Sequence, residues 1–265
     1  MNYEDIVKLH YLSQVSEKGL DAESTMPDHF VRKKEIETIL ETLSFLNKKD
    51  LKILEIGCGN GVLLNELYKN NYTSVTGIDF LEEFVKLSKS RNLPYEVKVG
   101  DVRSLQFDNE SFDVLISERV IINLLDKEHQ SKAFSEVRRV LKKKGYFIMF
   151  EASEDAWINS NNAREEFGLS KVPMPSQNRW FKENELDSFI DKRFKIIKEI
   201  NRQKLQPSNV LSSHYFMSRV VHAAIIKSLA GDIALRNTHF TRFFSELLPP
   251  QGNYAPVQFY CLEAI

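Results

Sequence analysis

Three glycines at alternate positions, Gly57, Gly59 and Gly61, mark the part of the sequence best suited to chemistry. They lie in the stretch LEIGCGNG (residues 54–61) and precede residues 62–70, whose apolar side chains recur at helical spacing. Glycine permits positive φ and has no Cβ, so backbone amides there can lie close to a bound molecule. A plain turn at a strand end would explain the glycines as well, and other residues must separate the two interpretations.

Three acidic side chains accompany the glycines. Glu55 precedes them, Asp79 ends the next strand-like run, and Asp101 ends the run after that. A carboxylate placed like Asp79 can accept hydrogen bonds from both hydroxyls of a ribose, and Asp101 can meet an adenine edge. The spacing Gly-x-Gly-x-Gly departs from the NAD pattern, because Val62 and Leu63 stand where that pattern has its third glycine. The residues therefore indicate a nucleoside site without the NAD fingerprint.

Such a site requires a sheet whose strands end together. Apolar runs and amphipathic segments alternate with short links, which predicts an α/β fold with a doubly wound, mostly parallel, seven-stranded sheet and helices on both faces. The predicted strands are residues 51–56, 74–79, 95–101, 112–117, 146–152, 194–200 and 256–264. The predicted helices are residues 31–46, 62–70, 82–90, 127–143 and 183–190.

In combination, these motifs resemble those of the class I S-adenosylmethionine-dependent methyltransferases. The matching segments are residues 55–61 (glycine-rich first motif), Asp79 (ribose-binding acid), residues 100–102 (adenine-side motif), residues 111–117 (fourth strand) and residues 137–151 (helix, turn and fifth strand). The match covers about residues 50–152. The resemblance implies a Rossmann-like fold, S-adenosylmethionine as the cofactor and S-adenosylhomocysteine (SAH) as its product.

The resemblance also implies which residues hold the cofactor. Gly57 should contact its methionine portion, Phe80 should flank the adenine, Val102 should donate a backbone N–H to it, and Ser117 and Glu118 should lie near the transferred methyl group. Before the first strand, Arg32 could meet the methionine carboxylate or could simply begin a surface helix. The full predicted cofactor-binding set is Arg32, Glu55, Gly57, Gly59, Gly61, Asp79, Phe80, Asp101, Val102 and Ser117.

We expect residues 1–265 to form a single methyltransferase domain, because one hydrophobic core can extend to roughly 250–300 residues. The predicted parts are an N-terminal helical cap (1–50), a cofactor-binding core (51–152), an insertion (153–180) and a helical lid between the last two strands (202–250).

Methyl transfer from a sulfonium asks little of side chains, which mainly hold the nucleophile in line and exclude water. A hydroxyl nucleophile usually needs a general base, whereas an amine must only arrive unprotonated. After the fourth strand no Asn/Asp-Pro-Pro-aromatic motif follows, which argues against amide and nucleobase N-methyltransferases. Arg119 stands there instead; it could bind a substrate carboxylate or phosphate, or it could pair with Glu118 or Glu151 as structural support. No set of acids and histidines follows at metal-ligand spacing, so we predict no metal.

The predicted lid is locally basic. Residues 202–245 contain six Lys or Arg side chains against one acid, Asp232, and three of the six histidines. His214, Ser218 and His222 fall at i, i+4 and i+8, roughly on one helical face. This face could supply an anion clamp and a general base, so His214, His222 and Arg119 are the predicted catalytic residues. A solvated helix face with incidental histidines is the alternative.

The overall charge is close to neutral. With 36 basic and 37 acidic side chains, no global field attracts nucleic acid or an anionic membrane. The sequence also contains no signal-peptide core at its start and no apolar run approaching the roughly 18 residues of a membrane helix. We therefore expect a cytoplasmic protein with a small-molecule substrate, no nucleic-acid or membrane partner, and either a monomeric or a homodimeric state.

The leading functional hypothesis is methyl transfer to an oxygen or nitrogen of a small anionic acceptor that bears a phosphate or carboxylate. The whole-chain pattern is also similar to methyltransferases that tailor bacterial surface polysaccharides, so a capsule or polysaccharide precursor is one candidate acceptor. The alternatives are a natural-product or other metabolite methyltransferase with a neutral acceptor and, more distantly, an NAD-dependent oxidoreductase or a non-catalytic cofactor-binding protein.

Overall fold

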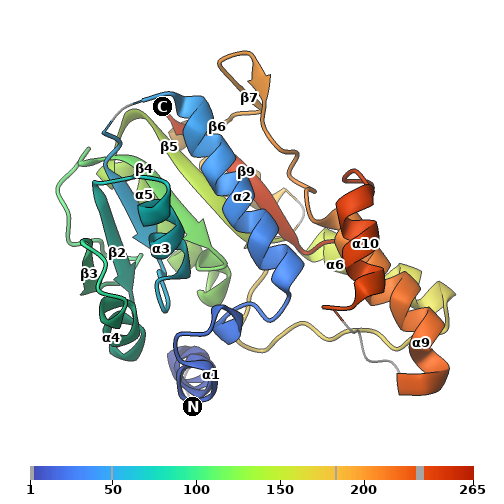
Figure 1. Ribbon diagram of the computed structural model, residues 1–265. Helices are drawn as coiled ribbons and strands as arrows, with labels where there is room; N and C mark the ends of the chain where they lie inside the picture. Colours follow the sequence, from blue (N-terminus) through green and yellow to red (C-terminus); the bar gives the residue numbers. More distant parts are fainter. Residues whose placement is uncertain (1–2, 49, 183, 231–235) are drawn as a thin grey trace.

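A seven-stranded sheet forms the centre of the computed structural model, which describes residues 3–48, 50–182, 184–230 and 236–265 (Figure 1). The strand order is β3-β2-β1-β4-β5-β9-β6. The strands are β1 (Ile53–Ile56), β2 (Val75–Asp79), β3 (Glu96–Val99), β4 (Phe112–Glu118), β5 (Leu141–Ala152), β6 (Phe194–Ile196) and β9 (Val257–Ala264).

Five neighbouring strands, β3 to β5 in the sheet order, run parallel, and β9 lies antiparallel between β5 and β6. The central strand β1 is buried along its whole length, as expected for a parallel strand covered on both faces. The predicted doubly wound, mostly parallel, seven-stranded sheet is therefore confirmed.

Helices cover the two faces of this sheet and bury separate apolar clusters. On one face, α2 (His29–Leu46), α3 (Val62–Lys69) and α4 (Glu82–Ser90) contribute Leu43, Leu64 and Val85 to one cluster. On the other face, α5 (Lys127–Val140) and α7 (Glu185–Ile190) contribute Phe134 and Phe189, whose rings stack 5.3 Å apart. The sheet is thus fixed from both sides, which fixes where its strands end.

The predicted N-terminal cap contains two helices, α1 (Tyr3–Lys18) and α2, joined through the short helix η1 (Ala22–Ser24). Figure 1 shows α1 beyond the end of the sheet, near α4. The rings of Tyr11 on α1 and Phe84 on α4 meet edge to face at 6.1 Å. Consequently α1 closes the edge at which the parallel strands end.

The predicted sixth strand is shorter than expected. β6 ends at Ile196, and the chain then forms a hairpin of β7 (Glu199–Ile200) and β8 (Gln203–Lys204). Asn201 and Arg202 form its two-residue turn, both with positive φ, which matches the right-handed twist of a hairpin. The apolar pattern of residues 194–200 could not reveal this break, because both halves are extended.

The insertion and the lid are largely helical. Within the predicted insertion (153–180), residues 154–166 form α6 (Glu154–Glu166). The predicted helical lid contains α8 (Ser212–Phe216), a π-helical turn η4 (Met217–Val221), α9 (His222–Ala230) and α10 (His239–Leu247). Asp232, the acid counted in the lid, lies outside the described residues. Within the part of the chain that the structure describes, no helix is long and apolar enough to span a membrane.

Phe134 offers a test of this packing, because its side chain is fully buried between α7 and the sheet. Phe134→Ala should lower the free energy of unfolding by about 3–5 kcal/mol, since it leaves a cavity in the core. Phe243→Ala on α10 is the matched control, because Phe243 is 60% exposed. Urea unfolding measures both, and equal losses for the two variants would contradict this description of the core.

Candidate active site

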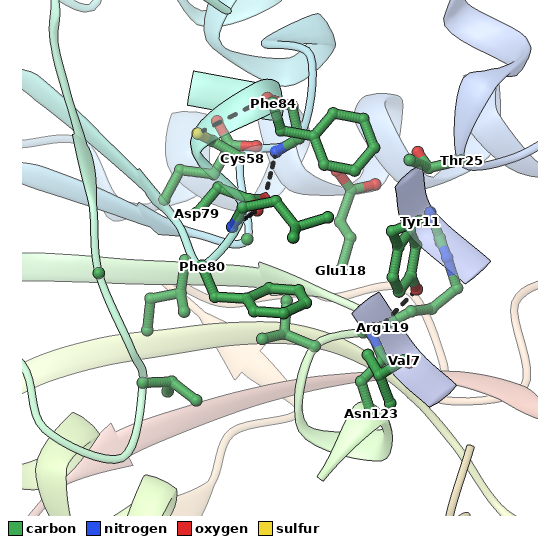
Figure 2. A pocket seen from close by; sticks show the side chains of 18 of the residues that line it. Val7, Tyr11, Thr25, Cys58, Asp79, Phe80, Phe84, Glu118, Arg119 and Asn123 are labelled. Carbon is green, nitrogen blue, oxygen red and sulfur yellow. Dashed lines mark hydrogen bonds between the residues drawn. The ribbon is translucent and has the colours of Figure 1, made fainter. Parts of the chain in front are cut away.

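A pocket of about 390 Å³ lies at the carboxyl ends of the parallel strands, beside α1 (Figure 2). Its volume is typical of small-molecule sites. The predicted residues that line it are Arg32, Glu55, Gly57, Gly59, Asp79, Phe80, Asp101, Val102 and Arg119. The predicted residues that do not line it are Gly61, Ser117, His214 and His222. The roles of individual residues stay predictions, but the structure brings most of the predicted set together.

The three glycines of the loop turn out to serve different purposes. Gly57, at φ +70°, leaves room for Val120, because a Cβ at Gly57 would collide with the Val120 side chain. A Cβ at Gly61 would lie 2.5 Å from Ser88 Oγ, so this glycine admits α4 and not a ligand. At Gly59 a Cβ would meet nothing closer than 3.9 Å, and this residue lines the pocket at φ +50°. Gly59 is therefore the glycine with open space beside it.

Asp79 holds this loop in place. Its Oδ2 accepts a hydrogen bond from the Gly59 N–H at 2.9 Å, and its Oδ1 accepts one from the Leu81 N–H at 2.9 Å. Burial raises the pKa of Asp79 to about 6, although these backbone bonds favour the ionised form. Each oxygen keeps a second lone pair, so the carboxylate can still accept two hydroxyl groups.

Glu55 and Glu118 present buried carboxylate oxygens that lack hydrogen-bond partners, Glu55 Oε2 and Glu118 Oε1. Burial, and then the charge of Glu118, raise the pKa of Glu55 well above its usual value. Arg32 lies beside them: its Nη1 is 3.7 Å from Glu118 Oε1, and its Nη2 donates to Thr25 Oγ1 at 2.6 Å. Unpaired buried polar atoms that line a pocket indicate that a polar ligand completes them.

The Asp101 carboxylate already forms an ion pair with a neighbouring side chain. Its carboxylate accepts hydrogen bonds from the side chain of Arg103, the shortest being 2.6 Å from Nη2. Asp101 therefore has less capacity for an adenine amino group than the sequence suggested, whereas Val102 lines the pocket unhindered by that ion pair.

Arg119 lines the pocket but also bonds to the cap. Its guanidinium donates to Glu35 on α2, a partner that the sequence analysis did not consider. Its backbone has φ +58°, a left-handed conformation that is rare for a residue with a side chain. Arg119 therefore has a structural ion pair, as one of the two interpretations expected, but with Glu35 and not with Glu118 or Glu151. Because the same side chain lines the pocket, its contact with a substrate stays a prediction.

Ser117 points away from the pocket, because its Oγ donates to Glu151 Oε1 at 3.3 Å. The sequence suggested Glu151 only as a possible partner of Arg119, and its role here was not predicted. Its carboxylate accepts the backbone N–H groups of Val120, Ile121 and Ile122 at 3.0–3.2 Å. It thereby fixes the turn after β4 that carries the pocket residues.

His214 forms a buried junction between the lid and the cap. Its Nε2 lies 2.8 Å from Asp28 Oδ2, its Nδ1 lies 2.5 Å from Ser245 Oγ, and Arg219 Nη2 donates to the same Asp28 oxygen at 2.8 Å. Burial would raise the pKa of Asp28, but the bond to His214 and the charge of Arg219 hold that pKa below its usual range. These contacts give His214 a structural role, and its position does not support a general-base role.

His222 is also buried outside the pocket, with its ring stacked on Phe240 at 4.8 Å. Two basic side chains of the lid have acidic partners of their own: Arg219 pairs with Asp28, and Arg242 lies 3.2 Å from Glu246. The predicted anion clamp in the lid therefore lacks support from this geometry. Over the described ranges no group of three or more His, Cys, Asp or Glu could hold a metal ion, and metal-independent catalysis stays a prediction.

Comparison with known proteins points to one domain type. Residues 53–145 match a family model described as a methyltransferase domain. The chain is 30% identical over 127 residues to an uncharacterized protein of Methanocaldococcus jannaschii, which covers 46% of this chain and 52% of that protein. It is 29% identical over 116 residues to a ubiquinone/menaquinone biosynthesis C-methyltransferase of Campylobacter jejuni, and this match covers 41% of this chain and 48% of that protein. The chain thus spans about half the length of these curated relatives.

The fold is similar to that of a solved structure over nearly the whole chain. Magnesium protoporphyrin IX methyltransferase from Synechocystis PCC 6803, solved with bound SAH, aligns with a TM-score of 0.60 at 13% identity, covering 99% of this chain and 100% of that one. At this identity the likeness concerns the fold, and its coverage includes the cap and the lid.

Asp28→Asn tests the structural role of the junction. The variant leaves Arg219, which is 9% exposed, without its anionic partner, so the free energy of unfolding should fall by about 3–5 kcal/mol. Glu246→Gln removes an exposed ion pair with Arg242 and should change it by less than about 1 kcal/mol. Urea unfolding at pH 7 compares them, and a loss for Asp28→Asn no larger than the control would refute the junction.

Glu151→Gln tests the support of the turn after β4. Burial raises the pKa of Glu151 to about 7 from a usual 4.5, so between these pH values the folded state binds more protons than the unfolded state. Stability therefore falls as pH rises through this window, by at most about 1.4 kcal/mol per pH unit, and levels off above it. When the free energy of unfolding is measured at several pH values, it should fall more steeply with pH for the parent than for Glu151→Gln. Parallel profiles for the two proteins would contradict the assignment.

Proposed function

We propose that this chain is a class I S-adenosylmethionine-dependent methyltransferase, which transfers the methyl group of S-adenosylmethionine to an oxygen or nitrogen of a small acceptor. The match of residues 53–145 to a methyltransferase-domain model supports this proposal. The observation that carries the proposal is the arrangement of Gly59 and Asp79, which places a bonded loop and a buried carboxylate on the wall of the same pocket. This arrangement occurs at the strand ends where nucleosides bind in open α/β sheets.

The residues of the pocket fit the proposed cofactor in charge as well as in place. The sulfonium and the amino group of S-adenosylmethionine are cationic, and the unpaired oxygens of Glu55 and Glu118 suit such groups. Arg32 suits the methionine carboxylate, and the free lone pairs of Asp79 suit the ribose hydroxyls. Phe80, 44% exposed at the pocket wall, is placed to stack on the adenine.

The cofactor brings an activated methyl group, so the protein mainly has to bind the cofactor and the acceptor and to orient them toward each other. The loop and Asp79 would fix the nucleoside end, and α1 would exclude water from the other end, where Tyr11 lines the pocket. Excluding water leaves the acceptor as the nucleophile nearest the methyl group.

We propose further that the acceptor carries an anionic group. Arg119 and Lys8 support this, because both line the pocket. The lid gives less support, because Arg219 and Arg242 pair with acidic side chains. The anion would therefore be held near α1, whereas the sequence predicted that the lid would hold it. A capsule or polysaccharide precursor and a neutral metabolite are both open as acceptors, and a cytoplasmic location with a monomeric or homodimeric state stays part of the proposal.

Asp79→Ala tests the central element of this proposal. The variant should bind S-adenosylmethionine about 10- to 150-fold more weakly, since it loses hydrogen bonds to a charged group worth about 1.5–3 kcal/mol. Asp187→Ala, which removes an exposed carboxylate on α7, should bind like the parent. Isothermal titration calorimetry measures all three proteins. No binding by the parent would remove the proposed function, and equal binding by Asp79→Ala would remove the role of Asp79.

A further inference from the structure

Tyr11 enters the pocket from α1 and faces the hollow that Phe80 and Phe84 line from other sides (Figure 2). Asn123, in the turn after β4, donates from Nδ2 to the Tyr11 hydroxyl oxygen at 2.9 Å. The phenol thus lies beside the turn that carries Arg119, at the opposite wall from the glycine loop.

The orientation of the Asn123 amide is fixed by its other bonds. Its Nδ2 also donates to the Arg119 carbonyl oxygen at 2.8 Å, so both amide hydrogens are in use. The Asn178 amide, in the orientation that satisfies its own neighbours, places its nitrogen 2.9 Å from Asn123 Oδ1. Asn123 can therefore only donate to Tyr11, and the Tyr11 oxygen acts as acceptor in that bond.

The hydroxyl hydrogen of Tyr11 must then be directed elsewhere. In the described part of the chain no group accepts it. Burial raises the pKa of Tyr11, so the phenol keeps this hydrogen at neutral pH. A partly buried hydroxyl that lines a pocket, with its oxygen accepting one hydrogen bond and its hydrogen free, is set up to donate to a ligand.

Among the described residues, no histidine or carboxylate contacts the Tyr11 hydroxyl. Among the described residues that line the pocket there is no histidine. Its central carboxylates have other contacts: Asp79 bonds to the glycine loop, Asp101 to Arg103, and Glu118 lies 3.7 Å from Arg32. Glu55 Oε2 lines the same pocket without a hydrogen-bond partner, but it makes no contact with the Tyr11 hydroxyl.

We propose that the Tyr11 hydroxyl donates its hydrogen bond to the methyl-accepting group, and that this group is an oxyanion, a carboxylate or phosphate, which needs no deprotonation. The inference rests on the proposed methyl transfer. An oxygen lone pair of the oxyanion forms the new O–C bond to the methyl carbon, the S–C bond breaks, and its electron pair stays on sulfur. One positive and one negative charge disappear together, and no proton is released. Arg119 supplies a positive charge on the same wall.

The binding test uses protein saturated with SAH and simple oxyanions, benzoate and inorganic phosphate, with benzamide as the neutral counterpart of benzoate. At least one oxyanion should bind the loaded parent, and benzamide should bind at least tenfold more weakly than benzoate if benzoate is the ligand. Tyr11→Phe should weaken oxyanion binding about tenfold or more while SAH affinity changes less than about twofold. Tyr68→Phe removes an exposed phenol remote from the pocket and is the control. No oxyanion binding, or parent-like binding by Tyr11→Phe, would overturn the proposal.

The turnover test counts protons. Carboxylic acids, phosphomonoesters, alcohols, phenols and amines are screened for SAH formation, and proton release is followed with a pH indicator in weak buffer near pH 8. The reacting acceptor should give SAH without a proton, and Tyr11→Phe should raise its KM more than it lowers kcat. Methanol released by alkali identifies a carboxyl ester, whereas a phosphate methyl ester resists that treatment. One proton per SAH would overturn the oxyanion assignment while leaving methyl transfer intact, whereas failure of the parent to bind cofactor would remove the proposed function itself.

Discussion

The pair of hydrogen bonds that Asp79 accepts is the constraint on which the site depends. One comes from Gly59 in the loop after β1, and the other comes from Leu81 at the start of the segment after β2. Because β1 and β2 are parallel neighbours, their carboxyl ends lie side by side, and a single buried carboxylate can bond to the backbone that follows each strand. The sheet therefore does more than support the loop: it fixes the distance between the carboxylate and the glycine backbone.

The opposite wall of the pocket is held by a second buried carboxylate. Glu151 on β5 accepts three backbone N–H groups from the turn after β4, and that turn carries Arg119 and Asn123 into the pocket. Arg119 in turn bonds to Glu35, which ties α2 of the cap to the same wall. Three charged side chains thus connect sheet, turn and cap, so this wall of the pocket depends on segments far apart in the sequence.

The sequence could predict the sheet and most of the residues that line the pocket beside the glycine loop, because both follow from local patterns. The alternation of apolar and amphipathic segments predicted where the strands end, and the strand ends predicted that Glu55, Asp79 and Asp101 lie at one edge of the sheet. Ser117 does not line the pocket, because side chains alternate across a strand: Glu118 lines the pocket, and Ser117 bonds to Glu151. His214 does not line the pocket either, for another reason. Helical spacing predicted its face of the helix, but its partner Asp28 lies 186 residues away, and no local pattern could indicate that contact.

The most direct measurement is a crystal structure of the protein with SAH. The account predicts electron density for the ligand in the pocket between the glycine loop and α1, with both ribose hydroxyls within hydrogen-bond distance of the Asp79 carboxylate and the sulfur facing Tyr11 and Arg119. Density for the ligand in another part of the molecule, or a ribose turned away from Asp79, would contradict it.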